Sequence, residues 1–421
     1  MSKNNLINIH CFGLEIGRLG FDEDRNASFF QYNPAVLSED LYANIFPQII
    51  RRIPETQIFR KYGDEVFRGL PPMIADSLPD VFGNVIFKAW LENTQKEFKK
   101  ISVLEQLAYV GKRGMGALEY LPSKEIKGEV TINLDEITAI VEKVLQNKEG
   151  VNQERLDSQA LLHIFKIGTS AGGIRPKILV SEHKETGAII PGDLVYSADY
   201  NHYLIKLGIN ENLSYSREII EYIYAEMALK AGINMMPAKL IEGKHFATLR
   251  FDRRNGKKIH VLTASGLTGW SHKDPSVSSY ENLFDLAHFL KVPHRDIEQL
   301  FRRMVFNLVF ANHDDHLKNH SFLYDEAADK WQLAPAYDLT YSLNPELNFT
   351  STSRALSING RRKGITIADV MTIADKYTVK NAKGIIHDIV SVISVFEQLG
   401  REWQLPDKVS ASITRDFTLY K

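Results

Sequence analysis

Residues 312–319 read Asn-His-Asp-Asp-His-Leu-Lys-Asn, and they decide how the rest of the chain is interpreted. This polar stretch follows an apolar, helix-like run over residues 301–310. The interval from Asp314 to Asn319 is five residues, which equals the interval between the base and a metal ligand in the catalytic loop of protein kinases. The alternative is a structural turn, because Asp and Asn are common in turns for local hydrogen-bonding reasons.

A second acidic residue lies nineteen residues after Asn319, in Pro-Ala-Tyr-Asp-Leu-Thr at 335–340. Asp338 closes a strand-like segment there, which is where a second metal-binding carboxylate is expected. In phosphoryl transfer, one carboxylate accepts the proton of the attacking hydroxyl. An amide oxygen and a second carboxylate hold Mg²⁺, which prefers oxygen ligands. The two stretches together contain the residue types that this chemistry needs.

Three histidines in and beside the first stretch, His313, His316 and His320, allow a zinc site as an alternative. No cysteine lies near them, and the chain shows no second cluster of ligands. We therefore expect His316 to orient a phosphate group or Asp314 rather than to bind zinc.

The composition is that of an ordinary globular protein. The chain has 421 residues, with 44% hydrophobic and 24% charged, and the net charge is −1 from 51 Lys and Arg against 52 Asp and Glu. Such a balance argues against bulk electrostatic binding to DNA or to a membrane. Cys11 is the one cysteine, so no intrachain disulfide forms, and we expect a cytoplasmic protein with Cys11 in its core.

A loop rich in small residues occupies 168–177 and reads Gly-Thr-Ser-Ala-Gly-Gly-Ile-Arg-Pro-Lys. Small residues let backbone N–H groups approach phosphate oxygens closely, although this loop lacks the Walker spacing and tight turns have similar composition. Lys206 lies inside a strand-like apolar run, on the same side as Leu204 and His202. It is expected either to bind ATP phosphates or to be an exposed lysine at a sheet edge.

A helix is predicted from Arg217 to Ala231, and its Glu218 or Glu221 is a candidate ion-pair partner for Lys206. Two strands then lead to Leu249 and Phe251, a segment that suits the reading of adenine by backbone groups.

We expect an α/β (α+β) fold in three segments. Residues 1–150 contain a small β-rich start and helices, residues 151–255 form the β-rich part of a nucleotide-binding core, and residues 256–421 are largely helical. Helices are predicted over 154–164, over 281–312 as two helices, and over 366–376, 379–398 and 408–418, and the Gly-rich run at 111–116 is predicted to be a turn. A β-rich nucleotide region followed by helices is the layout of a two-lobed phosphotransferase.

Four motifs in one order resemble the HipA family, the serine/threonine kinase toxins of bacterial toxin–antitoxin pairs. They are the loop at 168–177, Phe-Asp-Arg at 251–253, the stretch at 312–319 and the stretch at 335–340. Gly-Leu-Pro-Pro at 69–72 and Ala-Asp-Ser-Leu-Pro-Asp at 75–80 are similar to the N-terminal subdomain of that family. The resemblance covers nearly the whole chain.

The resemblance implies a two-domain fold with a kinase-like core that uses ATP and Mg²⁺. It implies Asp314 as the catalytic base, because the family aspartate lies two residues before the histidine, and it places Asn319 and Asp338 on Mg²⁺. Ser170 falls where some members are autophosphorylated and thereby switched off. The residues expected to contact ATP are Ser170, Ala171, Gly172, Gly173, Lys177, Lys206, Leu249, Phe251, His316 and Tyr337.

Two positions depart from the best-known members: Leu249 replaces an acidic residue, and the loop has Ala-Gly-Gly instead of a version with glutamine. The resemblance also implies a small helix-turn-helix, HipB-like antitoxin as partner, contact with DNA only through that antitoxin, and an aminoacyl-tRNA synthetase as a candidate substrate. A small-molecule or lipid kinase, and a kinase-shaped co-repressor subunit without catalysis, are the alternatives. The absence of a basic membrane-facing run argues against a lipid substrate.

Overall fold

A computed structural model of the chain describes residues 6–79, 83–85, 88–89, 101–123, 132–148, 175–192, 197–346 and 353–418. The chain divides into two compact units. Unit 1 comprises Met1–Asn210 and Ala247–Leu262, and unit 2 comprises Glu211–Phe246 and Thr263–Lys421. The three-segment division expected from the sequence stays a prediction.

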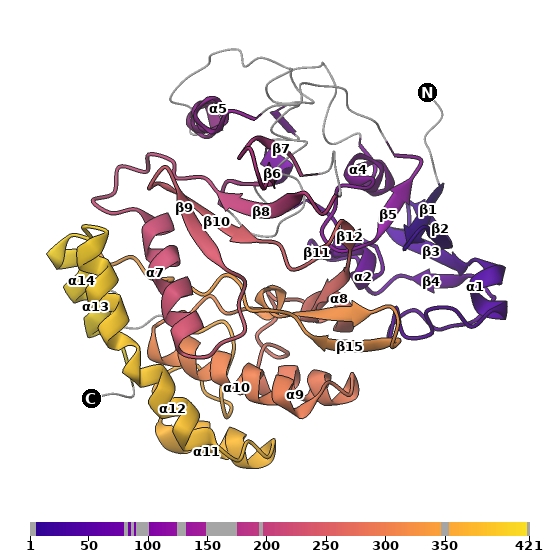
Figure 1. Ribbon diagram of the computed structural model, residues 1–421. Helices are drawn as coiled ribbons and strands as arrows, with labels where there is room; N and C mark the ends of the chain where they lie inside the picture. The colour runs from indigo at the N-terminus through magenta and orange to yellow at the C-terminus, as the bar shows by residue number, and fades with distance from the viewer. Residues whose placement is uncertain are drawn as a thin grey trace. The chain divides into compact units, whose positions relative to one another are not determined.

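Unit 1 begins with an antiparallel sheet of order β4-β3-β2-β1-β5 (Figure 1). Alternation of apolar and polar residues explains it: in β1, Ile7, Ile9 and Cys11 are buried and the residues between them are more exposed. The predicted core position of Cys11 is thus confirmed. The strands are β1 (Leu6–Cys11), β2 (Leu14–Asp22), β3 (Ala27–Tyr32), β4 (Gln57–Phe59) and β5 (Glu119–Leu121).

Short helices accompany this sheet. The main one, α4 (Val103–Val110), packs against β1, β2 and β5. Its start is fixed by a capping box, in which the Ser102 hydroxyl accepts from the backbone N–H of Glu105 and the Glu105 carboxylate accepts from that of Ser102. The helices α1 (Pro34–Ser38) and α2 (Pro72–Ala75) both have proline in their first turn.

The second sheet of unit 1 holds β7 (Ile189–Pro191), β6 (Lys177–His183), β8 (Tyr200–Lys206) and the end of β10 (His245–Leu249), in that order. The boundary between the units passes through β10. Unit 1 also contains α5 (Leu134–Lys148) and the small hairpin of β11 (Arg253–Arg254) and β12 (Lys257–Lys258). The strand β13 (His260–Thr263) ends at the second boundary.

Unit 2 is mainly helical. Its helices are α7 (Arg217–Lys230), α8 (Ala264–Thr268), α9 (Tyr280–Phe289), α10 (His294–Val309), α11 (Ile367–Lys376), α12 (Ala382–Ser391), α13 (Ile393–Glu402) and α14 (Asp407–Arg415). The segment predicted to be helical over 379–398 forms two helices, which meet at Val392. Its strands are β9 (Ala238–Ile241), the start of β10, β14 (Ser321–Asp325) and β15 (Lys330–Leu333).

The core of unit 2 forms around Tyr224 of α7. Its ring makes edge contacts with Phe306, Phe310 and Phe396, and Figure 1 shows α13 beside α7. The Tyr224 hydroxyl donates to the carbonyl of Phe310 at 2.8 Å. The aromatic cluster therefore holds the end of α10, which is the point where the polar stretch at 312–319 begins.

Over the residues with described structure, no helix combines the length and the apolar character needed to span a bilayer. The predicted helix over 154–164 lies outside the described residues.

Candidate functional site

The loop after α10 is built from two local features. Ala311 has a left-handed backbone (φ 53°) that ends the helix, and Leu317–Asn319 form one turn of 3-10 helix. Leu317 is fully buried and fixes that turn to the core. A left-handed alanine is uncommon, since its Cβ crowds the backbone. The chain thus accepts some local strain to turn sharply from the helix into the loop.

Asn319 is held in one orientation by its own loop. Its side-chain Nδ2 donates to the carbonyl of Asp314 at 2.9 Å, and its backbone N–H donates to the carbonyl of His316 at 2.8 Å. Because the amide nitrogen is used inside the loop, the amide oxygen Oδ1 is directed away from the Asp314 carbonyl. Such an oxygen is a ligand that suits Mg²⁺.

The segment of Asp338 is bonded to the same loop. Asn312 Nδ2 donates to the Asp338 carbonyl at 3.3 Å, and the Tyr337 hydroxyl donates to the carbonyl of Lys318 at 2.7 Å. Ser342 Oγ accepts from the backbone N–H of His313 at 2.7 Å. The structure therefore brings together the two stretches that the sequence singled out.

Asp338 itself has a left-handed backbone, with φ 57°. Our prediction that it closes a strand needs correction: β15 ends at Leu333, and what precedes Asp338 is an isolated parallel bridge between Met235 and Ala336. Asp tolerates the left-handed region better than most residues. Strained backbone of this kind is concentrated at functional sites.

The two neighbouring aspartates differ sharply in exposure. Asp314 is exposed, whereas Asp315 is 1% exposed and accepts hydrogen bonds from the Tyr280 hydroxyl at 2.7 Å and from Arg354 Nη2 at 2.9 Å. A base must reach its substrate. Exposure therefore favours Asp314 for that role, whereas Asp315 is part of the packing.

The histidines are placed in different surroundings. Burial lowers the pKa of His313 to about 4, and burial likewise lowers the pKa of His320 to about 4, so both are neutral near pH 7. His316 is partly buried, and its ring lies 5.2 Å from that of His272. Burial, with the charge of His316, lowers the pKa of His272 to about 3.

The zinc alternative finds no support in this geometry. Among the described residues of unit 2, no three His, Cys, Asp or Glu side chains bring their ligand atoms within 4.8 Å of one another. His272 is a neighbour of the loop that our sequence reasoning missed, because forty-four residues separate it from His316.

Unit 1 presents two lysines on facing positions of its second sheet. Lys177 of β6 and Lys206 of β8 are direct partners in the antiparallel register, so their side chains lie on one face. Both are buried, at 4% and 8% exposure. The expectation that Lys206 is an exposed edge lysine is therefore wrong. Lysine side chains are common ligands of phosphate groups, so a pair of them on one face suits a polyphosphate.

The predicted side of Lys206 is also confirmed. In the register Leu204 pairs with Leu179, and His202 pairs with Ser181, whose hydroxyl lies 2.8 Å from His202 Nδ1. Burial, with the charge of Arg250, lowers the pKa of His202 to about 4. A neutral histidine thus lies on the same face as the lysines without adding charge.

The Phe-Asp-Arg motif at 251–253 has a structural task that sequence reasoning did not find. Asp252 is fully buried and accepts from Arg250 Nε and Nη2 at 2.9 and 2.8 Å and from Arg253 Nη1 at 2.8 Å. It also accepts from the backbone N–H of Gly116 at 2.8 Å. Arg253 donates to the carbonyls of Gly116 and Gly114. The Gly-rich turn at 111–116 is therefore fixed to this ion-pair cluster.

The adenine-hinge residues lie next to that cluster. Leu249 ends β10 and Phe251 lies in the following turn, each partly buried. The backbone N–H of Arg250 donates to the carbonyl of His202 in β8. Nothing in the geometry identifies adenine as their ligand, so that role stays a prediction.

Two further parts of the predicted ATP site stay predictions. Ser170, Ala171, Gly172 and Gly173 lie outside the described residues. Glu218 and Glu221 of α7 are both buried at 3% exposure, and the proposed ion pair of one of them with Lys206 stays a prediction.

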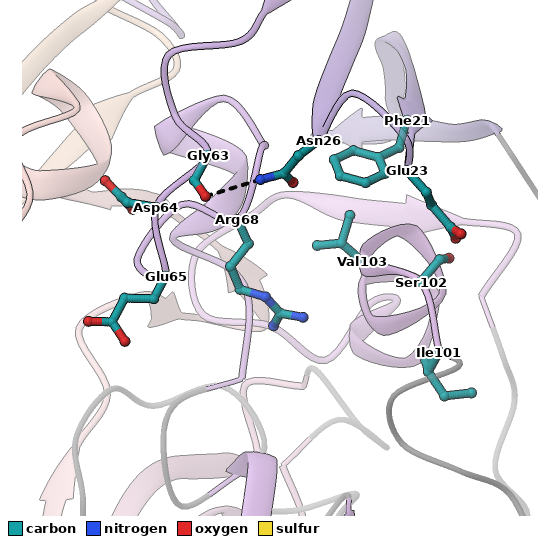
Figure 2. Close-up of a pocket in the computed structure, with 10 residues that line it drawn as sticks. All are labelled: Phe21, Glu23, Asn26, Gly63, Asp64, Glu65, Arg68, Ile101, Ser102 and Val103. Carbon is teal, nitrogen blue, oxygen red and sulfur yellow. Dashed lines mark hydrogen bonds between the residues drawn. The ribbon is translucent and has the colours of Figure 1, made fainter.

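A cavity of about 850 Å³ lies in unit 1, and none of the residues predicted to bind ATP is among those that line it. Figure 2 shows the Arg68 side chain among the residues that line it, with the bond from Asn26 Nδ2 to the Gly63 carbonyl on one wall. Arg68 Nη1 donates to Gln106 Oε1 at 2.8 Å, and burial lowers the pKa of Arg68. Carboxylates of Glu23 and residues 64–65 also line the cavity.

Family models and curated relatives both match parts of this chain. The model of the HipA-like C-terminal domain matches residues 169–396, and that of the HipA N-terminal domain matches residues 7–121. A candidate kinase of Haemophilus influenzae is 30% identical over 130 residues, covering 28% of this chain and 37% of the relative. The candidate kinase Y4dM of Sinorhizobium fredii is 25% identical over 126 residues, covering 28% and 31%. The matched part is thus about a third of each curated relative.

A solved structure extends the likeness to the whole fold. HipA of Shewanella oneidensis, in a complex with HipB and its operator DNA, superimposes with a TM-score of 0.64, covers 97% of each chain and is 18% identical. At that identity the likeness shows the fold alone. The two domain models, which between them match residues 7–121 and 169–396, show that this chain belongs to the HipA family.

Proposed function

We propose that this chain is an ATP- and Mg²⁺-dependent serine/threonine protein kinase that acts as the toxin of a toxin–antitoxin pair. The observation that carries the proposal is the hydrogen bond from Asn319 Nδ2 to the Asp314 carbonyl. It joins the predicted base to the predicted metal ligand through one short loop. The exposed carboxylate of Asp314, the fixed amide of Asn319 and the left-handed backbone of Asp338 occur in segments that are bonded to each other. A polar turn with a structural role alone does not require this combination.

In the proposed reaction, Asp314 accepts the proton of a serine or threonine hydroxyl and so favours its attack on the γ-phosphate. Asn319 Oδ1 and the Asp338 carboxylate would hold Mg²⁺, which when bound neutralises charge on the phosphates. The fit is one of donor chemistry, since amide and carboxylate oxygens are what this hard cation prefers.

The lysines of unit 1 are proposed to bind the phosphates of ATP. Lys177 and Lys206 share one face of their sheet, and a pair of ammonium groups suits a polyphosphate better than a single charge does. Leu249 and Phe251 are proposed to meet the adenine. His316 and Tyr337 are proposed as further ATP contacts.

Ser170 is proposed as a site of autophosphorylation, in the loop whose Ala171, Gly172 and Gly173 would approach the phosphates. A phosphoserine there brings close to two negative charges into an anion-binding loop and competes with ATP for the same donors. Phosphorylation of Ser170 would thus switch the kinase off.

The proposed partner is a HipB-like antitoxin with a helix-turn-helix. The similar Shewanella protein was solved with HipB and operator DNA, and the net charge of −1 suits DNA contact through a partner better than direct binding. An aminoacyl-tRNA synthetase is proposed as the protein substrate, and the cytoplasm as the place of action.

Intact-mass spectrometry after incubation with Mg-ATP tests the proposal, with Asp314→Asn and Ser170→Ala beside the wild type. We expect a gain of one phosphate in the wild type and none in either variant. No gain and no ATP binding by calorimetry would instead indicate a kinase-shaped subunit without catalysis. Transfer of labelled phosphate to a small molecule or lipid, but to no protein, would indicate a small-molecule or lipid kinase instead of a protein kinase.

A further inference from the structure

The catalytic loop of unit 2 is bonded to the chain segment that follows Asp338, and a buried charge pair makes the connection. Arg354 Nη2 donates to Asp315 Oδ2 at 2.9 Å and to the carbonyl of Asn312 at 2.7 Å. The backbone N–H of Ala355 donates to the carbonyl of His313 at 2.8 Å. Residues 354–355 therefore bond to three of the four residues at 312–315.

The pair is shielded from water on both sides. The Arg354 and Asp315 side chains are 3% and 1% exposed. Asp315 Oδ2 also accepts from the Tyr280 hydroxyl at 2.7 Å, and that hydroxyl in turn accepts from Asn307 Nδ2 at 3.0 Å. Asn307 of α10 lies in the helix that leads into the loop. The charge pair is thus part of a continuous buried network from α10 to residue 354.

The far end of the segment is anchored as well. Arg362 Nη1 donates to the carbonyl of Arg354 at 3.0 Å, and its Nη2 donates to the carbonyls of Pro275 and Ser278 at 2.7 Å each. The backbone N–H of Ser357 donates to the same Ser278 carbonyl at 3.2 Å. Residues 354–362 are therefore bonded both to the loop and to the chain that precedes α9.

In protein kinases the segment after the metal-binding aspartate controls activity, and it is commonly ordered when a phosphate added to it pairs with arginine. Here the charges are reversed: the catalytic loop supplies the anion, Asp315, and the segment supplies the cation, Arg354. Both charges are present in the unmodified chain.

Resting on the proposed function, we infer that Asp315 and Arg354 are positioning residues that hold Asp314 in its working orientation without phosphorylation of the segment at 340–362. In this role Asp315 does not contact the substrate. It acts through Arg354, which also donates to the backbone carbonyl of Asn312. Phosphorylation of the segment at 340–362 is then not required for activity, whereas the proposed switch at Ser170 acts on the loop at 168–177.

The test uses the full chain, phosphoryl transfer from labelled ATP, and the variant Arg354→Ala, which removes a buried guanidinium and leaves space for a small ion. We expect kcat to fall about 10-fold to 100-fold, as for a misplaced catalytic group, while KM for ATP changes little. Millimolar guanidinium ion should restore kcat in a saturable way. Arg361→Ala is the matched control, since Arg361 lies in the same segment with a side chain 60% exposed.

Asp315→Asn provides a second variant with nearly unchanged shape, and it should lower kcat without response to guanidinium. Phosphopeptide mapping of active wild type should find residues 340–362 unmodified. Wild-type kcat in folded Arg354→Ala, a loss of kcat that guanidinium does not restore, or a phosphate required at 340–362 would each overturn the inference. An inactive wild type would overturn the proposed function first, and the inference with it.

Discussion

The ion-pair cluster at Asp252 allows a prediction with a magnitude. In Asp252→Asn the carboxylate that accepts from Arg250, Arg253 and the Gly116 backbone becomes a neutral amide whose nitrogen faces the guanidinium groups. The Arg250 and Arg253 side chains are 2% and 1% exposed, so water cannot replace the lost charge. Two buried cations are left without their anion.

Removing one member of a buried ion pair costs roughly 3–5 kcal/mol, because the remaining charge stays desolvated. A domain of 150–250 residues loses about 2–4 °C of unfolding temperature per kcal/mol, so the transition of unit 1 should shift down by about 6–20 °C. The Gly-rich turn at 111–116 should become accessible to protease at the same time, since Asp252 and Arg253 hold it.

Differential scanning calorimetry of wild type and Asp252→Asn measures this shift. Asp22→Asn is the matched control, because Asp22 pairs with Arg25 at 3.6 Å on the surface of the same unit, and such pairs contribute less than about 1 kcal/mol. Equal shifts in the two variants would refute the reasoning that burial gives the Asp252 cluster its strength.

The sign of the pH dependence follows from the same contacts. Burial alone raises the pKa of Asp252, but the charges of Arg250 and Arg253 outweigh it and hold that pKa well below its ordinary value of 3.8. A depressed carboxyl pKa contributes stability that is present above pH 4 and is lost as the pH falls below it. Asp252→Asn should therefore lose less stability than the wild type when acidified below pH 4.

Three further predictions concern single positions. Gly116 (φ +72°) and Gly187 (φ +69°) share a left-handed backbone, but only at Gly116 would an added Cβ meet neighbouring backbone, at 3.1 Å. In urea unfolding, Gly187→Ala should lower the free energy of unfolding by about 1–2 kcal/mol, and Gly116→Ala should lower it by about 1–3 kcal/mol more. Equal losses in the two variants would contradict this. Burial lowers the pKa of His320 from 6.5 to about 4, so the protein loses stability as the pH is lowered from 6.5 to 4. His320→Gln should reduce this slope by up to about 1.4 kcal/mol per pH unit, and an unchanged slope would refute it. Lys206→Ala should weaken ATP binding about 10-fold or more, measured by calorimetry, whereas replacement of the exposed Lys184 by Ala should leave it unchanged. Equal ATP affinities in the two variants would show that Lys206 does not bind the phosphates.

The helix before the loop at 312–319 and the side of Lys206 on its strand were predicted because they depend on short-range patterns, whereas the strand expected before Asp338 is absent. The apolar period of residues 301–310 produces a helix, and the polar residues after it produce the loop in which Asn319 bonds back to Asp314. The alternation of side chains along the strand correctly predicted that Lys206 lies on the same face as Leu204 and His202. In each of these cases, residues within a few positions of one another decide the outcome.

What sequence reasoning missed depends on long-range pairing. The alternative of an exposed edge lysine at Lys206 stayed open in the sequence, because pairing of β8 with β6 covers it and no local signal reveals which strands pair. Asp252 bonds to Gly116, 136 residues away, and Asp315 bonds to Arg354, 39 residues away.

The central claim is that Asp314 is the base of a phosphoryl-transfer site. The most direct measurement is the rate of γ-phosphate transfer from labelled Mg-ATP by wild type and Asp314→Asn at equal ATP occupancy, which calorimetry establishes first. We expect Asp314→Asn to bind ATP like the wild type and to transfer phosphate at least about 100-fold more slowly, as for loss of a general base. Transfer at the wild-type rate by Asp314→Asn would contradict the assignment.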